Sequence, residues 1–571
     1  MTKYIVVAGG VMSGVGKGVT TSSLGKILLE HGYKVTAIKI DPYINYDAGT
    51  LRPTEHGEVW ITDDGGEIDQ DLGNYERFFG VDIPKKNNIT TGQIYKTLID
   101  KERNGEFLGE TVQFIPHVPE EIKRRIKLAS EGYDFALIEI GGTIGDYENV
   151  PFLFAMKSLE RELGENSVAY VLITYLPTPS HIDEMKTKPT QQAIRMLSEH
   201  GIFPDFIICR AKKPLDEVRK KKIETYVNIP IEHIISEPDI DTIYQIPIDL
   251  EKENLGQKIL SHFKMKTSKK PDWSKWESMV KIIRNPEKRL SVAIIGKYVK
   301  TGDYQLADSY ISINHALAHA GMKNKAGINI EWLDSNLLEK RSGEELLKKY
   351  DGIIIPGGFG SKGVEGKINA ITYARTNNIP FLGLCFGLQL AVIEYARNVC
   401  NLSRANTTEI DEKTPYPVVD ILPSQKEIIQ KHEYGATMRL GEYAAILKEG
   451  SKVLGLYKKT SRIKEDVKRL HVLKTRQNEK FRLGILGKEK HIILERHRHR
   501  YEINPDYIEA LEKNDLVFSG WHIKEDKAML MEFLEINGHK FFIATQSHPE
   551  FKSRIEDPSP LFLGFVEAMC E

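Results

Sequence analysis

The sequence predicts an α/β protein with two three-layer domains, each built on a sheet that helices cover on both faces. Three observations lead to this prediction. The chain has 571 residues, more than one hydrophobic core usually holds. Short apolar, β-branched runs alternate with helix-like stretches in both halves, a pattern typical of parallel strands buried on both faces. Between the halves, residues 264–290 are rich in lysine and arginine and contain no strand-like run.

The expected strands divide into two sets. Those of the first half are Tyr4–Ala8, Val35–Ile40, Phe135–Ile140, Val168–Tyr175 and Phe206–Cys209. Those of the second half are Ser291–Gly296, Ile328–Leu333, Gly352–Pro356, Pro380–Leu384 and Phe541–Thr545. We therefore expect a first domain at residues 1–265, a connector at 266–289 and a second domain at 290–571, each domain with a parallel sheet. In the connector, one helical face is expected to pack through Trp273, Trp276, Met279, Ile282 and Ile283.

The composition is that of an ordinary globular protein. Lysine plus arginine (79) nearly balances aspartate plus glutamate (80), so no net field favours nucleic acid or an anionic membrane. The four cysteines have no metal-type spacing and form no disulfide framework, which predicts a reducing, cytoplasmic compartment. We find neither a signal peptide nor an apolar run long enough to span a membrane.

A phosphate-binding loop is predicted directly after the first strand, in the run GGVMSGVGKGVTTSSLGKILLEHG. Its glycines free backbone N–H groups to face a phosphate, and the helix that follows adds a favourable dipole. Lys17 would neutralise phosphate charge. Gly18 stands where a strict phosphate loop has the magnesium-binding Ser or Thr, so the metal needs other ligands. Without a ligand, the same run would be a tight strand–helix turn.

Two acids are the candidate Mg²⁺ ligands, Asp71 in DQDLGNYER and Glu139 in ALIEIGGTIGDYE. Glu139 lies in an apolar strand, where an unpaired carboxylate is costly, whereas an acid such as Asp71, taken alone, is more often a solvated or capping acid. The run KTKPTQQ at Lys186–Gln192 could hold a second polyphosphate or be solvated surface. Lys39 and Asp41 follow the second strand and point to the same crevice.

The second half contains a cysteine elbow. A strand leads into Cys385, glycines flank it two residues away on each side, and FGLQLAVIEYA predicts a helix behind it. A helix start lowers the thiol pKa, and the N–H groups of Phe386 and Gly358 are the expected oxyanion donors. His548 is the expected base and Glu550 would orient it. The alternative is a buried cysteine with a structural role only. The motifs PGGFG and SHPE elsewhere in the second half favour the catalytic interpretation.

Two basic stretches carry weaker signals. Glu495–Tyr501 (ERHRHRY) is too short for a metal or nucleic-acid patch in a neutral protein, and its alternation predicts a strand with two polar faces, one facing the glutamine site. Lys458–Lys490 is expected to be an exposed excursion of the second domain.

These motifs together resemble the CTP synthase family over essentially the whole chain. The residues that carry the resemblance are SGVGKG, KIDPYIN, EHGEV, DLGNYERF, IEIGGTIGD, KTKPTQ, PGGFG, GLCFGLQ, TMRLG and ERHRHRYE. The second half alone would indicate a class I glutamine amidotransferase. The resemblance implies that ATP phosphorylates O4 of UTP and that ammonia from glutamine, passed through an internal tunnel, displaces the phosphate to form CTP. It also implies that Pro53, His56 and Val59 lie at the tunnel entrance.

The resemblance further assigns binding residues. It places ATP at Gly14, Val15, Gly16, Lys17, Gly18, Val19, Asp71, Asp239 and Ile240, and Mg²⁺ at Asp71 and Glu139. It places UTP, or the inhibitor CTP, at Ser13, Lys186, Thr187, Lys188, Pro189, Thr190, Gln191 and Lys222, with Asp146, Tyr147 and Glu148 at the CTP site. It places glutamine at Gly358, Phe386, Gly387, Leu388, Gln389, Glu409 and Arg500. Activation by GTP and a homotetramer formed through the N-terminal domains are implied as well, and filaments of tetramers are an open alternative.

Three positions depart from the family pattern. Phe386 replaces the usual leucine and makes the pocket wall bulkier, and Ser547 replaces an aromatic residue that is frequent before the base. Lys362 replaces arginine in a loop that serves GTP activation, and a lysine does not reproduce arginine's planar fork.

Two other functions would use some of the same motifs. A cobyrinate-type amidating synthetase would activate a carboxylate instead of uracil, but KIDPYIN and KTKPTQ argue against it. A catalytically silent nucleotide-sensing or filament-forming protein would not need Lys17, Cys385 and His548 together.

Overall fold

The computed structural model describes residues 1–52, 56–182, 184–296, 300–301, 304–305, 310–340, 343–358, 360, 363–421, 438–487 and 491–571. These residues form two compact units. The first comprises Met1–Leu51 and Glu67–Lys281, and the second comprises Arg52–Gly66 and Ile282–Glu571. The short segment 52–66 therefore belongs to the second unit, although the chain on either side of it belongs to the first.

The first unit is built on a seven-stranded parallel sheet with the order β5-β2-β6-β1-β7-β8-β9. The strands are β1 (Lys3–Gly9), β2 (Val35–Asp41), β5 (Asn88–Thr90), β6 (Phe135–Ile140), β7 (Val168–Tyr175), β8 (Phe206–Ala211) and β9 (Ile234–Pro238). Because nearly every strand residue is buried, the sheet needs a cover of helices on both faces.

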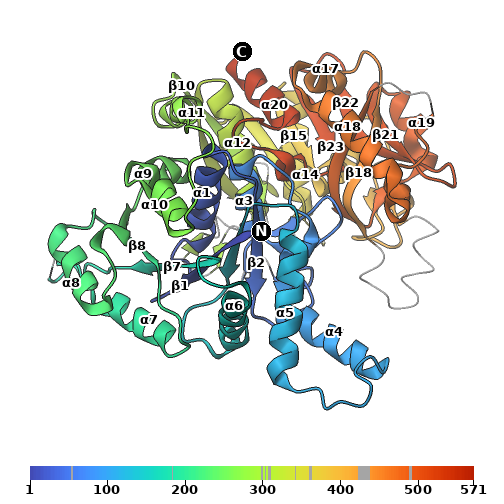
Figure 1. The fold of residues 1–571 in the computed structure, drawn as a ribbon. Coiled ribbons are helices and arrows are strands. Elements are labelled where there is room, and N and C mark those ends of the chain that lie inside the picture. Colours follow the sequence, from blue (N-terminus) through green and yellow to red (C-terminus); the bar gives the residue numbers. More distant parts are fainter. Residues whose placement is uncertain are drawn as a thin grey trace. The chain divides into compact units, whose positions relative to one another are not determined.

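Two groups of helices cover this sheet (Figure 1). One face carries α4 (Thr91–Arg103), α5 (Phe114–Ser130), α6 (Val150–Leu163), α7 (Lys188–Ser198) and α8 (Glu217–Val227). The other carries α1 (Lys17–Glu30), α3 (Asp71–Phe79), α9 (Ile246–Lys252) and α10 (Leu255–His262). The predicted three-layer arrangement is thus confirmed for this unit.

The predicted connector helix is α11 (Ser274–Arg284). Trp276, Met279 and Val280 are buried on it, whereas Trp273 and Ile282 are half-buried. The Trp276 indole donates a hydrogen bond of 2.7 Å to the carbonyl of Tyr244, so this part of the connector is anchored on the first unit.

The second unit contains a nine-stranded sheet with the order β13-β10-β14-β15-β23-β22-β21-β18-β19. The strands are β10 (Lys288–Gly296), β13 (Ala326–Asp334), β14 (Gly352–Ile355), β15 (Phe381–Leu384), β18 (Arg439–Leu447), β19 (Ile492–His499), β21 (Leu516–Ile523), β22 (Met529–Ile536) and β23 (Phe542–Thr545). All ten expected strands are present to within a few residues. The five strands expected in this half pair parallel, as predicted. The further strands β22, β21, β18 and β19 pair antiparallel, so the sheet as a whole is mixed. The turn from Lys524 to Ala528 joins β21 to β22, and so short a link permits an antiparallel pair but no crossover.

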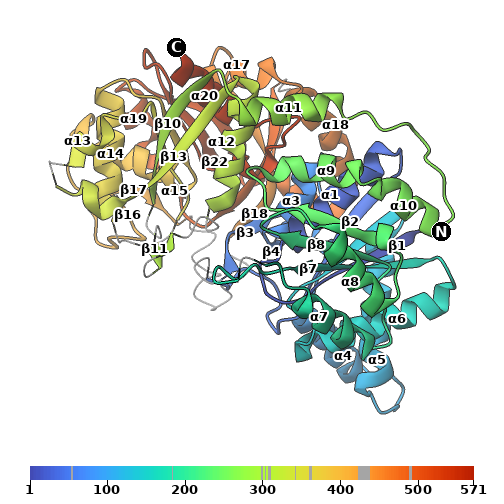
Figure 2. The same ribbon diagram turned by 90° about the vertical axis from the view of Figure 1, so that its left-hand side faces the viewer.

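Helices cover both faces of the second sheet (Figure 2). One face carries α13 (Glu344–Leu347), α14 (Val364–Thr376) and α15 (Phe386–Asn398), and the other carries α12 (Ile311–Lys323), α17 (Lys452–Lys459) and α20 (Pro560–Cys570). Beside α15 lies a small sheet of β16 (Ala405–Thr407), β17 (Tyr416–Asp420) and β20 (Glu502–Ile503). The remaining elements of this unit include β3 (Val59–Ile61), α18 (Arg462–Thr475) and α19 (Ile508–Glu512).

The basic stretch that begins at Lys458 is only partly exposed. On α18, Arg462, Asp466, Leu470 and Leu473 are buried, and the two leucines pack against β18 and β19. The expectation of an exposed excursion is therefore wrong for this helix, because its charged residues find buried partners. Within the described part of the chain, no helix is both long and apolar enough to cross a membrane.

Candidate active sites

Cys385 forms a sharp elbow between β15 and α15. Its backbone has φ 51° and ψ −101°, a conformation that costs free energy in a non-glycine residue and is typical of a displayed nucleophile. The N–H of Cys385 donates to the carbonyl of Thr545 at 2.7 Å, which fixes the turn against β23. A Cβ at Gly387 would come within 2.3 Å of the Ile355 carbonyl oxygen, so a glycine is required for this close packing.

His548 lies beside Cys385 with Glu550 behind it. The Nδ1 atom of His548 is 2.7 Å from Oε1 of Glu550, which holds the ring in place. Burial by itself lowers the pKa of His548, but the negative charges of Glu550 and Cys385 outweigh it and raise that pKa to about 10. The imidazole is therefore protonated at neutral pH and places its positive charge beside Cys385.

Two further groups lie close to the thiol. The Nε2 atom of Gln546 lies 3.8 Å from Sγ of Cys385, and the thiol lies 3.8 Å from the carbonyl oxygen of Arg498 on β19. The predicted strand at Glu495–Tyr501 therefore does reach the cysteine site. Gln546 also accepts a hydrogen bond from Gln389 at 3.3 Å. No motif singled out Gln546, although it stands two residues before the base in QSHPE.

The expected glutamine-binding residues surround the elbow unevenly. Gln389 donates to the carbonyl of Tyr501 at 3.0 Å, and Glu409 accepts from the N–H of Gly360 at 2.9 Å, which ties it to the PGGFG loop. Leu388 is completely buried in the core, so its side chain has a packing role. Gly358 lies within the loop that follows β14, and Arg500 follows β19.

Phe386 and Ser547, the two residues beside the catalytic groups that differ from the family pattern, are both buried. Phe386 is 2% exposed, and the Lys367 ammonium lies 5.3 Å from the centre of its ring. Ser547 is completely buried, with its hydroxyl 2.6 Å from that of Thr545. A hydrogen bond thus replaces the packing expected of an aromatic residue. Lys362 lies outside the described residues.

The other histidines of this region are buried and neutral. Burial, with the nearby charge of Arg439, holds the pKa of His497 and His499 well below the ordinary value, and lowers that of His522 to about 3. Arg439 itself pairs with Glu502 and Glu532. Among the described residues, no group of three or more His, Cys, Asp and Glu has the arrangement of a metal site.

In the first unit, the glycine-rich loop runs from β1 into α1. Gly16, with φ 93°, begins the helix, and Lys17 is the first helical residue. Nζ of Lys17 donates to the carbonyl of Gly142 at 2.6 Å, and burial lowers its pKa. Ser13 and Gly14 are exposed in the same loop. Arg210 donates to Val15 at 3.0 Å and to Asp239 at 3.2 Å, which brings the loop next to the expected adenine residues Asp239 and Ile240.

The two candidate metal ligands meet beside the loop. Nζ of Lys39 is 2.9 Å from Glu139 and also pairs with Asp71, while Tyr75 donates to Glu139. Burial opposes the charge on Lys39, but these acids raise its pKa well above the ordinary value. Burial, reinforced by the charge of Asp71, raises the pKa of Glu139. The sequence had pointed to Lys39 but not to its position between the two acids.

Gly18 has a defined role in this arrangement. A Cβ at position 18 would lie 2.1 Å from Oδ1 of Asp71. The residue that departs from the phosphate-loop pattern is therefore the one that makes room for the carboxylate. Paired carboxylates next to a phosphate loop suit Mg²⁺, which prefers a few carboxylate oxygens together with phosphate oxygens and water. The residues present fit this ion.

The expected UTP and CTP residues fall into two groups. Asp146, Tyr147 and Glu148 are exposed after β6, and Asp146 accepts from the N–H of Thr143 at 2.6 Å close to the carbonyl that Lys17 contacts. The second group begins α7: Lys186 pairs with Glu184 at 2.7 Å, Thr187 is the N-cap, and Lys188 and Pro189 open the helix. Thr190 is buried, and its hydroxyl lies 3.0 Å from that of Thr174, so it supports the helix.

A cavity joins two of these residues. Gln191 and Lys222 line the same open cavity of about 690 Å³ between α7 and α8, together with Glu217, Val218, Lys221, Thr225 and Tyr226. This cavity carries three basic or amide side chains that could contact a phosphorylated ligand.

A cysteine–histidine–glutamate elbow and a phosphate loop with paired acids, in one chain, define an ATP-dependent ligase that draws ammonia from glutamine. The comparisons identify the family. The model of the CTP synthase N-terminus matches residues 3–265, and that of the class-I glutamine amidotransferases matches residues 305–568. The chain belongs to the CTP synthase family, and it is a ligase that converts UTP to CTP with glutamine and ATP.

Full-length relatives support this assignment. A CTP synthase of Pyrococcus furiosus is 48% identical over 571 residues, which is 100% of this chain and 98% of that protein. The CTP synthase of Methanocaldococcus jannaschii is 48% identical over 572 residues, covering 99% of this chain and 98% of the relative. A solved structure, the Trypanosoma brucei CTPS glutaminase domain with bound acivicin, is 32% identical and covers 49% of this chain and 94% of that chain, with a TM-score of 0.40. The corrinoid-amidating and catalytically silent alternatives are set aside.

Proposed function

We propose that Cys385 releases ammonia from glutamine and that the first unit uses it to aminate UTP that ATP has phosphorylated at O4. The functional domains are residues 1–265 and 290–571, with a connector at 266–289. Support comes from the occurrence of a nucleophile–base pair in one unit and a phosphate loop with its own paired acids in the other. Each half of the reaction therefore has its own site.

The thiolate of Cys385 attacks the amide carbon of glutamine, and the N–H groups of Phe386 and Gly358 bind the oxyanion. His548 gives its proton to the departing nitrogen, which leaves as ammonia, and a thioester remains on the enzyme. His548 then takes a proton from water, whose hydroxide attacks the thioester and releases glutamate. Gln389, Glu409 and Arg500 hold the substrate in place.

In the first unit, Gly14–Val19 hold the ATP phosphates and Lys17 neutralises their charge. Asp71 and Glu139 hold Mg²⁺, which neutralises phosphate charge when bound. Asp239 and Ile240 face the adenine. Ser13, Lys186–Gln191 and Lys222 bind UTP, or CTP as inhibitor together with Asp146–Glu148.

Regulation and assembly complete the proposal. GTP activates the enzyme, the active form is a homotetramer joined through the first units, and the enzyme acts in the cytoplasm. Ammonia passes an internal tunnel at Pro53, His56 and Val59. Val59 is buried on β3 and His56 is exposed, and Pro53 lies outside the described residues.

A pair of variants tests the two-site proposal. Cys385→Ala abolishes CTP formation from glutamine and leaves CTP formation from added ammonia within about twofold, because the first unit is intact. Lys17→Ala abolishes both, because phosphoryl transfer is lost. CTP is followed with each nitrogen source, with and without GTP. If Cys385→Ala also lost the ammonia reaction, or Lys17→Ala retained it, the division of roles would be wrong.

A further inference from the structure

A segment from the N-terminal part of the sequence lies directly behind the catalytic histidine. Trp60 on β3 is completely buried, and its ring centre lies 5.0 Å from that of Phe551. The Phe551 ring in turn stacks on the imidazole of His548, with centres 5.2 Å apart and planes at 18°. Three aromatic rings therefore run in contact from residue 60 to the base.

A second connection reaches His548 through its backbone. Nε of Arg496 donates to Oδ1 of Asp63 at 2.6 Å, and the guanidinium lies 5.3 Å from the Trp60 ring. The carbonyl of the same arginine accepts the N–H of His548 at 2.7 Å, and Nη1 donates to the carbonyl of Phe551 at 3.3 Å. Arg496 is completely buried, so it holds one position between segment 52–66 and the base.

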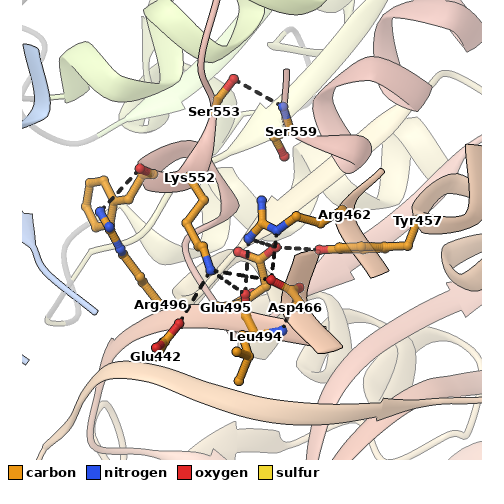
Figure 3. A network of polar contacts seen from close by, with 12 residues as sticks. Glu442, Tyr457, Arg462, Asp466, Leu494, Glu495, Arg496, Lys552, Ser553 and Ser559 are labelled. Carbon is orange, nitrogen blue, oxygen red and sulfur yellow. Dashed lines mark hydrogen bonds and ion pairs between the residues drawn. The ribbon is translucent and has the colours of Figure 1, made fainter. Parts of the chain in front are cut away.

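A buried polar network lies next to Phe551 and Arg496 (Figure 3). Lys552, next to Phe551 in the chain, donates to the carbonyl of Leu494 at 2.9 Å and pairs with Glu442 at 3.5 Å. In the same network, Arg462 pairs with Asp466 and Glu495 at 3.2 Å. The helix α18 of the basic stretch thus stiffens β19 and the turn that carries His548.

Asp63 is attached to this network at several points. Arg469 on α18 pairs with its carboxylate, and the Asp63 carbonyl accepts the N–H of Glu442 at 2.9 Å. Although burial opposes its charge, Arg496 and Arg469 hold the pKa of Asp63 well below the ordinary value. The carboxylate therefore remains ionised and keeps both arginines in place.

We propose that Trp60 and Asp63 are positioning residues that hold the imidazole of His548 against Cys385. They touch neither the thiol nor its substrate, and act through Phe551 and Arg496. A catalytic base must be placed to within a fraction of an ångström, and a displacement of about 1 Å can cost about 100-fold in rate. Since residues 51 and 67 belong to the first unit, the base of the glutaminase site is held by a segment tied at both ends to the synthetase unit.

The inference rests on His548 being the base, as proposed above. The experiment uses the full-length enzyme and three measurements: the pH profile of Cys385 alkylation by iodoacetamide, located by peptide mass spectrometry; kcat and KM for glutamine hydrolysis; and CTP formation from added ammonia. Cys400, which is half-buried, is the internal reference for alkylation. The alkylation profile reports the thiolate and is insensitive to a loss of stability alone.

The variants are Trp60→Leu and Asp63→Asn, with Trp60→Phe as the conservative replacement. Asp64→Asn is the matched control on the same turn, where Asp64 accepts a hydrogen bond from the hydroxyl of Thr62 at 2.6 Å. We expect the first two variants to raise the apparent pKa for alkylation by about one unit and to lower kcat by about 10–100-fold. KM for glutamine stays within threefold and the ammonia reaction within twofold. Trp60→Phe recovers most of kcat, and Asp64→Asn is unchanged.

Two results would overturn the inference. In one, alkylation profile and kcat stay at wild-type values in both variants. In the other, both variants lose the ammonia reaction in parallel with glutamine hydrolysis. Trp60 and Asp63 would then stabilise the whole fold and would not position His548 specifically. His548→Asn separates this inference from the proposed function. If that variant leaves the alkylation profile unchanged, the base itself is misassigned; if it shifts the profile and the other variants do not, the positioning role alone fails.

Discussion

Restoring the missing hydroxyl of the phosphate loop should inactivate this enzyme. A serine at position 18 would match the usual phosphate-loop pattern and supply a metal ligand. In this structure, however, its Cβ would lie 2.1 Å from Oδ1 of Asp71 and 2.7 Å from its Cγ. Real Cβ contacts start near 3.0 Å, so the carboxylate must move by about 1 Å.

That displacement sets the expected magnitude. Asp71 is paired with the buried Lys39, so it cannot yield freely, and overpacking of this kind costs about 1–3 kcal/mol. A misplacement of about 1 Å in a reacting site costs about 100-fold in rate, or about 2.7 kcal/mol. We therefore expect Gly18→Ser and Gly18→Ala to lower kcat for ammonia-dependent CTP formation by about 100-fold or more, with equal effect.

The assay is CTP formation with saturating ATP, UTP and ammonia. Alkylation of Cys385 in the same samples checks that the second unit is folded. Gly455→Ala is the control, because an added Cβ at Gly455 on α17 meets no atom within 4 Å. It should leave turnover unchanged. Wild-type or faster turnover in Gly18→Ser would refute the reasoning, since it would show that Asp71 need not approach the loop.

Three other changes test the packing and charge of the protein. Phe386→Leu should destabilise the second unit by about 1–2 kcal/mol through the lost ring volume, yet leave kcat for glutamine hydrolysis within threefold because the backbone N–H is unchanged; denaturant unfolding and a glutaminase assay measure the two effects. Trp276→Ala should cost the first unit about 3–5 kcal/mol, and a drop below 1 kcal/mol would deny the connector its anchoring role. Lowering the pH from 7.5 to 5.5 should destabilise the protein by about 1.4 kcal/mol through His522 alone. Its pKa is about 3 when folded, so the imidazole takes up a proton near pH 6.5 only after unfolding. His522→Gln should lose less stability over this range, and an equal loss would contradict the argument.

Much of the fold could be predicted because its signals are local. A buried parallel strand such as Phe135–Ile140 is a continuous apolar run, and its bounds in the structure are the expected ones. In the antiparallel half of the second sheet, only the strand at Glu495–Tyr501 was expected. Strands β21 and β22 were missed, because charged or polar residues interrupt their apolar runs. Likewise, α18 was expected to be exposed on account of its lysines and arginines, whereas Arg462 and Asp466 are buried as a pair.

The cysteine elbow, the phosphate loop and the histidine–glutamate pair were determined by the sequence itself. Each is a short motif whose residues stand within a few positions of one another, so their chemistry can be deduced without knowing the fold. The tertiary structure decided what lies between motifs. It placed Lys39 between Asp71 and Glu139. It brought the Asp71 carboxylate so close to Gly18 that a Cβ there would clash. It also placed Trp60 and Asp63 behind His548, a base almost 500 residues further along the chain. Such contacts depend on how distant strands and loops meet, and no local pattern records that.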